Sequence, residues 1–295
     1  MLFFGENLMI DENLQGQVAY VGALENYLAE TGEDELDVEG IIEQIPVSAP
    51  ELHSKIEARR LISVLDVGSG NGKKGLNLAR WLDERGVVVR MDCVEPKSEQ
   101  RDRLIENHQV FDYRYLGRVF PTTFDNADLR NRYDLVLLLH SLYEFPKQEG
   151  IIQGLERLSR IQNARGAGVV IIESQNADFE RMKNALCPRF GEMRQVSKKD
   201  VLNTFQALGI KYWVGEDINF TLPLYGLDKT SDLNIGKGFD FLFSHSIEGS
   251  GLKKSDYEMI GKWIKENARV GNSGSRYLDV SDSCIWFYKL EKRII

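Results

Sequence analysis

From residue 61 onward, short apolar runs alternate with amphipathic segments. Residues 61–67, 87–95, 133–140 and 168–173 are apolar runs that indicate buried strands, and residues 113–120 form a weaker run of the same kind. Helical periodicity fills the intervals, over residues 74–84, 97–107 and 150–161. Strands that are apolar almost throughout and alternate with helices are typical of a parallel sheet covered on both faces. The pattern therefore predicts an α/β fold with a doubly wound sheet.

Residues 1–60 precede this alternation and are predicted to form an N-terminal helical cap. One amphipathic helix is expected over residues 16–45, where acidic residues dominate from position 30 to position 43. Pro46 and Pro50 are expected to break the helical pattern before the first strand begins.

Residues 61–295 are predicted to form a single domain. After the alternating part, Ser197 is a suitable N-cap for a further helix, and a strand at 210–214, a helix at 255–267 and a closing strand at 284–290 follow. Residues 218–254 lack a regular pattern and contain several glycines. Because so long an irregular segment is unusual in a compact domain, this one is expected to form a wall or lid of a ligand pocket.

Composition narrows the range of functions. The net charge is -8, whereas a protein that binds phosphates usually carries an excess of Lys and Arg, so nucleic acid is disfavoured and a cationic ligand is favoured. The three cysteines, Cys93, Cys187 and Cys284, are far apart, which argues against a disulfide framework or a zinc site, and no metal is expected. No segment has the roughly 18 apolar residues of a membrane span, and a cytoplasmic location is expected.

The main chemical signal is a glycine-rich turn between the first strand and the first helix. Residues 66–72 read Asp-Val-Gly-Ser-Gly-Asn-Gly, and Gly68, Ser69 and Gly70 allow a tight turn with close approach of a ligand. Glu95 ends the next strand, where a carboxylate can accept hydrogen bonds from both ribose hydroxyls of a nucleoside. The turn and the acid together predict a nucleoside cofactor site.

Two cofactors fit this site. Residues 70–75 match the dinucleotide pattern G-x-G-x-x-G. Asp66, however, lies just before the first glycine and would repel a pyrophosphate, whereas S-adenosylmethionine carries a sulfonium and an ammonium and no phosphate. Asp66 therefore favours S-adenosylmethionine, with an NAD(P)-dependent reductase and a non-catalytic nucleotide-binding module as the alternatives.

Residues 61–175 resemble the class I S-adenosylmethionine-dependent methyltransferases. Residues 66–72 look like the first motif of these enzymes, and Glu95 looks like the acid at the end of their second strand. The resemblance implies a seven-stranded Rossmann-like sheet with one antiparallel strand near its end, which would be residues 284–290.

A narrower resemblance, to the histamine N-methyltransferase-like family, extends over most of the chain. It is carried by residues 94–100, 133–135, 140–143, 208–212 and 239–242 in that order. It implies that Gln100 contacts the cofactor, that Thr122 or Thr123 lies near the adenine, and that Leu139 packs beside the methionine part.

The same resemblance implies that His140 faces the substrate, that Tyr143 lines its pocket, and that Glu33 supplies a carboxylate for a substrate amine. The chain departs from this family at two places. His140 stands where an amide side chain is expected, and Ser281 or Asp282 replaces a second amide near the C-terminus. At the end of a buried strand, His140 is a candidate general base for a protonated acceptor, with a structural histidine as the alternative.

The expected function is methyl transfer from S-adenosylmethionine to a small molecule, with an amine nitrogen as the favoured acceptor. The alternative within the same class is an oxygen methyltransferase of a natural-product pathway. A small-molecule substrate is the expected partner, without nucleic acid or membrane, and the oligomeric state is left open.

Overall fold

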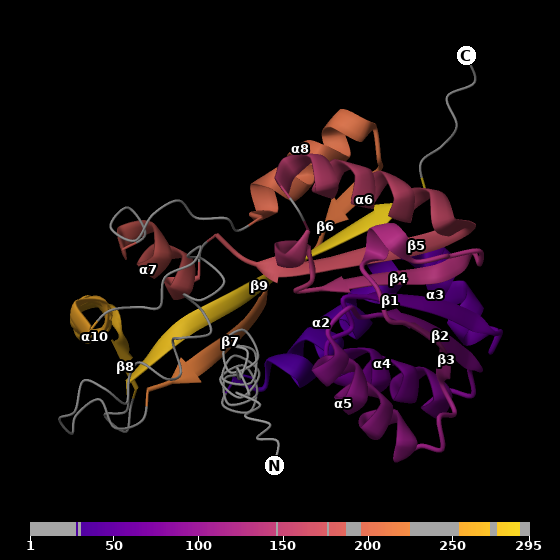
Figure 1. Ribbon diagram of the computed structural model, residues 1–295, viewed down its shortest axis with the longest axis horizontal. Helices are drawn as coiled ribbons and strands as arrows, with labels where there is room; N and C mark the ends of the chain where they lie inside the picture. The colour runs from indigo at the N-terminus through magenta and orange to yellow at the C-terminus, as the bar shows by residue number, and fades with distance from the viewer. Residues whose placement is uncertain are drawn as a thin grey trace, which may run out of the picture. The chain divides into compact units, whose positions relative to one another are not determined.

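The computed structural model of the chain describes residues 28, 31–145, 147–175, 177–186, 196–224, 254–271 and 276–289 (Figure 1). The chain divides into two compact units. The larger unit comprises Gly32–Arg181, Arg194–Thr221 and Asp279–Ile295, and the smaller comprises Met1–Thr31, Met182–Met193 and Leu222–Leu278. The predicted sheet and all of the predicted site residues belong to the larger unit.

Five parallel strands form the main part of the sheet. They are β1 (Ile62–Val67), β2 (Val89–Val94), β3 (Leu116–Phe120), β4 (Tyr133–Leu139) and β5 (Gln162–Glu173). With β6 (Tyr212–Val214) and β9 (Arg276–Tyr288), the strand order is β3-β2-β1-β4-β5-β9-β6. The order reverses at β1, which is the arrangement of a doubly wound sheet, so the predicted fold class is confirmed.

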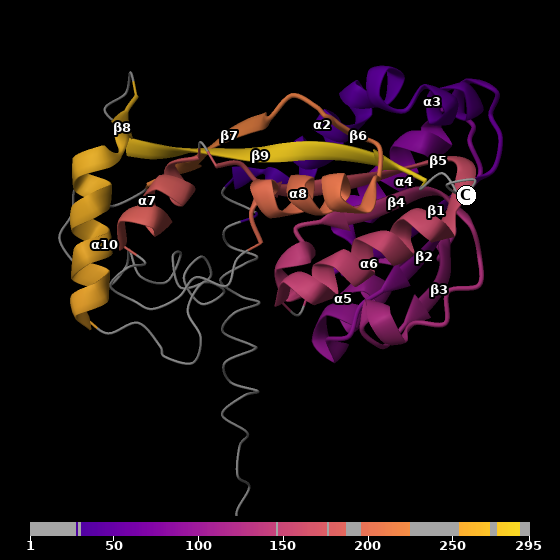
Figure 2. The same ribbon diagram turned by 90° about the horizontal axis from the view of Figure 1, so that it is seen from above.

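β9 is the antiparallel strand that the resemblance implied, and it pairs with β5 on one side and β6 on the other. It begins at Arg276, well before the predicted start at position 284, and Figure 2 shows it as one continuous strand. The early start arises because β8 (Arg269–Val270) and β7 (Ile218–Pro223) also pair with β9. Those pairings provide hydrogen-bond partners for the backbone of the first part of β9, and a local sequence pattern cannot show that these distant partners exist.

Helices cover both faces of the sheet, as the apolar strands require. Figure 1 shows α6 (Lys147–Ile161) and α8 (Lys198–Leu208) on one face, and α4 (Lys73–Glu84) and α5 (Ser98–Gln109) on the other. The α6/α8 side buries Ile151, Leu155, Leu158, Val201 and Phe205 against alternate strand residues. These strand residues include Leu65, Val67, Val136, Leu138, Val170 and Ile172. Ser197 caps α8 through a complete capping box, as its position predicted.

Two helices of the region before β1 are described, and they differ from the expected single helix. α2 (Glu33–Ser48) begins directly after Gly32, whose φ of 67° interrupts helical backbone. The prediction that Pro46 breaks the helix was wrong, because Pro46 lies in the last turn of α2, where a missing N–H costs a single hydrogen bond. The chain turns only at Ala49, and Pro50 then starts α3 (Pro50–Glu57) at the position where proline is tolerated.

The segment predicted to be irregular begins with a strand. β7 buries Ile218, Phe220 and Leu222, while Asn219 and Thr221 are exposed, which is the period-two pattern of a half-buried strand. Residues 225–253, the rest of the predicted lid, lie outside the described residues, and so does Cys187. In the smaller unit, α10 (Lys254–Asn267) confirms the predicted helix. None of the described helices has the length and apolar character needed to cross a membrane.

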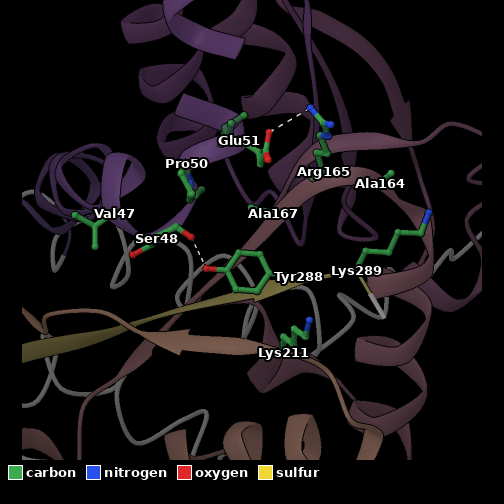
Figure 3. A pocket seen from close by; sticks show the side chains of 13 residues that line it. Val47, Ser48, Pro50, Glu51, Ala164, Arg165, Ala167, Lys211, Tyr288 and Lys289 are labelled. Carbon is green, nitrogen blue, oxygen red and sulfur yellow. Dashed lines mark hydrogen bonds and ion pairs between the residues drawn. The ribbon is translucent and has the colours of Figure 1, made fainter. Parts of the chain in front are cut away.

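A separate cavity of about 650 Å³ lies in the larger unit, at the junction of α2 and α3 and the start of β5 (Figure 3). Arg165, which forms an ion pair with Glu51, and Tyr288, whose hydroxyl donates to the Ser48 carbonyl, are among the residues around it. It lies toward the amino end of β5, whereas the predicted site residues follow the carboxyl ends of the parallel strands. This cavity is therefore distinct from the predicted site.

One glycine of the sheet carries a testable packing prediction. Gly168 pairs with Phe287 across β5 and β9, and an ideal Cβ at Gly168 would lie 2.1 Å from the Phe287 ring. Gly168→Ala is expected to lower the free energy of unfolding by about 1–3 kcal/mol, measured by urea denaturation, because the ring must move out of a closely packed core. In a Phe287→Ala background the same change should cost much less. Equal costs in the two backgrounds would contradict this packing.

Candidate functional site

The turn between β1 and α4 is built from glycines in the left-handed region. The φ angles are 68° at Gly68, 55° at Gly70 and 77° at Gly72. An ideal Cβ at Gly68 would lie 2.5 Å from the Cβ of Ser141, so a side chain is excluded there by sterics as well as by φ. At Gly70 an ideal Cβ meets no described atom within 4 Å. The turn thus presents its backbone to open space, as a site for a close-fitting ligand requires.

Glu95 fixes the conformation of this turn. One of its oxygens accepts a hydrogen bond from the Gly70 N–H at 2.9 Å, and the other accepts from the Lys97 N–H at 2.9 Å. The side chain is buried at the end of β2. Glu95 therefore ties the end of β2 to the glycine-rich turn.

Asp66 is a buried acid in the last part of β1. Burial and, second to it, the negative charge of Glu95 raise the pKa of Asp66 to about 7. The Ser69 hydroxyl and the Lys74 ammonium oppose this increase. The first turn of α4 packs closely against Asp66, since an ideal Cβ at Gly75 would lie 2.7 Å from the Asp66 carboxylate. A cationic group bound here would favour the ionised carboxylate.

The remaining predicted cofactor residues all follow or end strands at the carboxyl edge. Gln100 is buried in the first turn of α5, which follows β2. Thr122 and Thr123 follow β3, and the Thr123 hydroxyl accepts a hydrogen bond from the Asn126 side chain at 3.1 Å. Leu139 is the last residue of β4. Their order along the sheet edge is compatible with the predicted roles, which stay predictions.

His140 follows β4 in an unusual conformation. Its φ is 55°, in the left-handed region that a non-glycine residue rarely adopts. Its backbone N–H donates to the Ile171 carbonyl at 3.0 Å, so the neighbouring strand holds this turn in place. Backbone outliers of this kind cluster at functional sites.

Three buried carboxylates surround one nitrogen of His140. Its Nε2 lies 3.3 Å from Glu33 Oε1, 3.2 Å from Asp37 Oδ2 and 3.2 Å from Asp282 Oδ2. Two predicted substrate residues, Glu33 and Asp282, are thus brought to His140 by α2 and β9, far apart in sequence. We call Glu33, Asp37, Lys74, His140 and Asp282 the ionic cluster.

Asp37 and Lys74 are members of the ionic cluster that the sequence analysis missed. The Lys74 ammonium donates to Glu33 at 2.7 Å and to Asp37 at 2.6 Å, and both partners are buried. Two signals could have identified these residues. Asp37 is four residues after Glu33 and so shares its helix face, and Lys74 lies in the first helical turn after the glycine-rich turn.

The charges of the ionic cluster shift one another's pKa values. Burial opposes charge on His140, but Asp282 and Glu33 outweigh it and raise the pKa of His140 well above its usual value. Burial raises the pKa of Asp282 to about 7, against the effect of His140. Burial would also raise the pKa of Asp37, but Lys74 and His140 outweigh it and lower that pKa. Asp282 and Glu33 therefore favour the protonated imidazole of His140, and a further cation nearby would oppose it.

Tyr143 and Ser281 complete the list of predicted site residues. The rings of Tyr143 and His140 are 6.2 Å apart, and the Tyr143 hydroxyl accepts a hydrogen bond from the Glu173 N–H at 2.9 Å. An aromatic ring beside carboxylates suits a cationic ligand. Ser281 is buried in β9 next to Asp282, and successive strand residues point to opposite faces. The structure therefore brings Asp282, and not Ser281, to His140.

The ionic cluster also contains a donor set that a divalent cation could use. Glu33, Asp37, His140 and Asp282 each offer one ligand atom, and these atoms lie within 4.8 Å of one another. The Lys74 ammonium already forms ion pairs with two of these ligands, Glu33 and Asp37. We therefore assign no metal to this cluster.

Comparisons with known proteins bear on the fold. No family model matches the chain, and no curated protein sequence matches it at a significant level. The solved structure of the YcgJ protein from Bacillus subtilis is similar, with a TM-score of 0.54 and 14% identity, over 82% of this chain and 99% of that chain.

Other similar structures are less alike. An S-adenosylmethionine-dependent methyltransferase from Clostridium acetobutylicum has a TM-score of 0.41 and 11% identity, over 87% of this chain and 92% of that chain. Geranyl diphosphate C-methyltransferase from Streptomyces coelicolor, solved with Mg²⁺, geranyl diphosphate and S-adenosyl-L-homocysteine, has a TM-score of 0.43 and 13% identity, over 78% of this chain and 73% of that chain. The similarity to the Bacillus subtilis protein shows a shared fold.

Proposed function

We propose that the protein is a methyltransferase that uses S-adenosylmethionine and methylates the amine nitrogen of a small molecule. The observation that carries the proposal is that two separate sets of acidic residues lie at the carboxyl edge of the sheet. Asp66 and Glu95 lie at the glycine-rich turn, and the ionic cluster lies next to the end of β4. The first suits a cationic nucleoside, and the second suits an ammonium.

The proposed cofactor fits the turn on physical grounds. The open space over Gly70 can admit a ligand against the backbone, and the neighbouring Glu95 carboxylate is of the kind that accepts hydrogen bonds from ribose hydroxyls. The buried acid Asp66 favours a cation and disfavours a pyrophosphate. We therefore assign Asp66, Gly68, Ser69, Gly70 and Glu95 to the cofactor. Gln100, Thr122, Thr123 and Leu139 are assigned by the resemblance to class I and histamine N-methyltransferase-like enzymes.

The ionic cluster supports an amine as the acceptor. It contains three carboxylates and two cationic side chains, and burial raises the pKa of the Asp282 carboxyl to about 7. A further cation beside Asp282 would stabilise its ionised carboxylate, because a buried negative charge is costly without a partner. Glu33 and Asp282 would orient the ammonium, and the ring of Tyr143 would line its pocket. Because His140 and Asp282 stand where the histamine-methylating family has amides, we expect an amine other than histamine.

Little covalent chemistry is required of the protein. Bound S-adenosylmethionine would supply a methyl group already activated by its positively charged sulfur. The acceptor must lose a proton so that its lone pair can form the N–CH₃ bond as the S–CH₃ bond breaks. The residues of the chain orient the acceptor, exclude water and receive that proton, for which His140 is the assigned group.

A methyl-transfer screen tests the proposal. The protein is incubated with S-adenosylmethionine labelled in the methyl group and with separate sets of amines, phenols and carboxylic acids. Label in amine products is the expected result. Turnover of phenols or acids alone would reject the nitrogen assignment, and calorimetric binding of NADH without binding of S-adenosylhomocysteine would reject the cofactor.

Glu95→Ala gives a second test, directed at the cofactor. The change is expected to weaken binding of S-adenosylhomocysteine by about 1.5–3 kcal/mol, the scale for losing hydrogen bonds to a charged group. Isothermal titration calorimetry measures the effect, and circular dichroism checks that the variant is folded. An unchanged dissociation constant in a folded variant would show that Glu95 does not hold the cofactor.

A further inference from the structure

We propose that Asp37, held by Lys74, is the positioning residue for His140, so that the imidazole meets the methyl acceptor through Nδ1 and not through Nε2. This inference rests on the proposed function. It adds roles for Asp37 and Lys74 and names Nδ1 as the reacting nitrogen of His140.

The hydrogen bond from His140 goes to Asp37. Three carboxylate oxygens lie within 3.3 Å of Nε2, and the contact with Asp37 Oδ2, at 3.2 Å, has the geometry of a hydrogen bond. A ring nitrogen carries at most one proton and so donates to one acceptor well. Nε2 is therefore occupied by Asp37 and enclosed by the carboxylates of Glu33 and Asp282.

Asp37 is held in place by Lys74, which lies at the start of α4, next to the proposed cofactor turn. Its Oδ2 also accepts from the Lys74 ammonium at 2.6 Å, and its side chain is fully buried. Lys74 is two residues after Gly72, which ends the glycine-rich turn. A short chain of contacts thus joins the proposed cofactor turn to His140 through Lys74 and Asp37.

The second nitrogen of His140 remains available. Within the described residues Nδ1 makes no hydrogen bond, and it is not among the fully buried polar atoms that lack a partner. The His140 side chain keeps 21% of its surface exposed, while Asp37 and Asp282 are almost completely enclosed. We therefore take Nδ1, the ring nitrogen outside these carboxylate contacts, as the atom that an entering molecule meets.

This arrangement defines the route of the proton. When an ammonium enters on the Nδ1 side of the ring, its charge favours release of the Nδ1 proton of the imidazolium to solvent. The acceptor N–H bond then breaks as the Nδ1–H bond forms, and the lone pair left on nitrogen attacks the methyl group. The imidazolium that results is stabilised by the three carboxylates around Nε2. In an Asp–His pair of this type the carboxylate selects the tautomer and holds the ring orientation.

The first experiment needs no substrate. The full-length protein is labelled with ¹⁵N in histidine, and the His140 ring resonances, one set among four histidines, are identified by their loss in His140→Gln. As pH is raised until His140 becomes neutral, the remaining proton should stay on Nε2. In the part of the chain that the structure describes, the titratable groups that face the ring are Glu33, Asp37, Lys74, Tyr143 and Asp282. A neutral ring with its proton on Nδ1 would overturn the proposal, whatever the enzyme methylates.

The second experiment compares two neighbouring acids of α2. Asp37→Asn is expected to lower kcat for the amine found in the screen by about 100-fold, with KM and S-adenosylhomocysteine affinity changed little. Asp37→Glu, which keeps the charge, should recover part of the loss. Asp34→Asn is the matched control, because Asp34 is also buried, lies 3.8 Å from Lys74 and is not among the carboxylates that pair with His140.

The outcomes separate this inference from the proposed function. The control should keep kcat within about threefold of the wild-type value. Equal losses in the Asn variants of Asp37 and Asp34, or no loss in Asp37→Asn, would overturn the positioning role. If the wild-type protein methylates no amine, the proposed function fails, while the tautomer of His140 still decides whether Asp37 positions the ring.

Discussion

Lys74→Met is expected to lower the free energy of unfolding by about 3–5 kcal/mol, the cost of removing one partner from a buried ion pair. Lys74 holds two buried carboxylates, at 2.7 Å from Glu33 and 2.6 Å from Asp37. Methionine fills much of the same volume but leaves both acids without their ammonium. The cost arises mainly from carboxylates that remain buried without a cation, because the lost attraction is partly offset by the desolvation of the lysine itself.

Urea denaturation at pH 7 measures this effect, and Lys73→Met is the matched control. Lys73 is the preceding residue of the same helix, and its side chain is exposed. Because the pKa of Asp37 is lowered below 3.8, the contribution of Lys74 should persist at neutral pH and decline as pH falls through that lowered value. A Lys74 variant as stable as the Lys73 variant would show that the cluster is not held by this ammonium.

Asp66→Asn is expected to have the opposite effect and to stabilise the unliganded protein at pH 8. Burial and Glu95 raise the pKa of Asp66 from 3.8 to about 7, so ionising this group in the folded state costs about 4 kcal/mol at most. Asparagine has nearly the same shape and carries no charge. The same substitution should weaken cofactor binding, because it removes the acid that would balance the cofactor cations. Gains in stability at the expense of binding are common at functional sites.

The pH dependence of this effect has a definite sign. Below pH 3.8 Asp66 is protonated in both the folded and the unfolded chain, so its stabilising contribution is complete. That contribution is lost as pH rises to about 7, and above this value the penalty is constant. Urea denaturation of both proteins between pH 4 and pH 8 should therefore show a difference that grows with pH. Asp102→Asn, at an exposed position of α5, is the control, and a difference that does not change with pH would contradict the buried-acid interpretation.

The parts of the fold that could be predicted from sequence are those with local signals. The glycines of residues 68–72 predicted the turn because each takes a positive φ or lies against a neighbouring atom. The apolar runs predicted β1, β2, β4 and β5 because strands buried on both faces contain few polar residues. The antiparallel strand was expected from the family resemblance, and its pairing with β5 and β6 bears this out.

The features that could not be predicted depend on contacts between distant segments. The ionic cluster joins residues of α2, α4 and β9, and no local pattern shows that Asp37 and Lys74 meet at His140. The start of β9 at Arg276 was missed for the same reason, because strand pairing there depends on β7 and β8. Pro46 was misassigned since the penalty for proline depends on how much helix follows it.

The left-handed backbone at position 140 limits how this site can change during evolution. Apart from glycine, the residues that tolerate a φ of 55° are chiefly asparagine, aspartate and histidine. Asparagine and histidine both belong to that set, so an exchange of His140 for asparagine would leave the main chain undisturbed. Specificity at this edge of the sheet can therefore diverge by single substitutions among a few polar residues, whereas larger or β-branched side chains would first require a different turn.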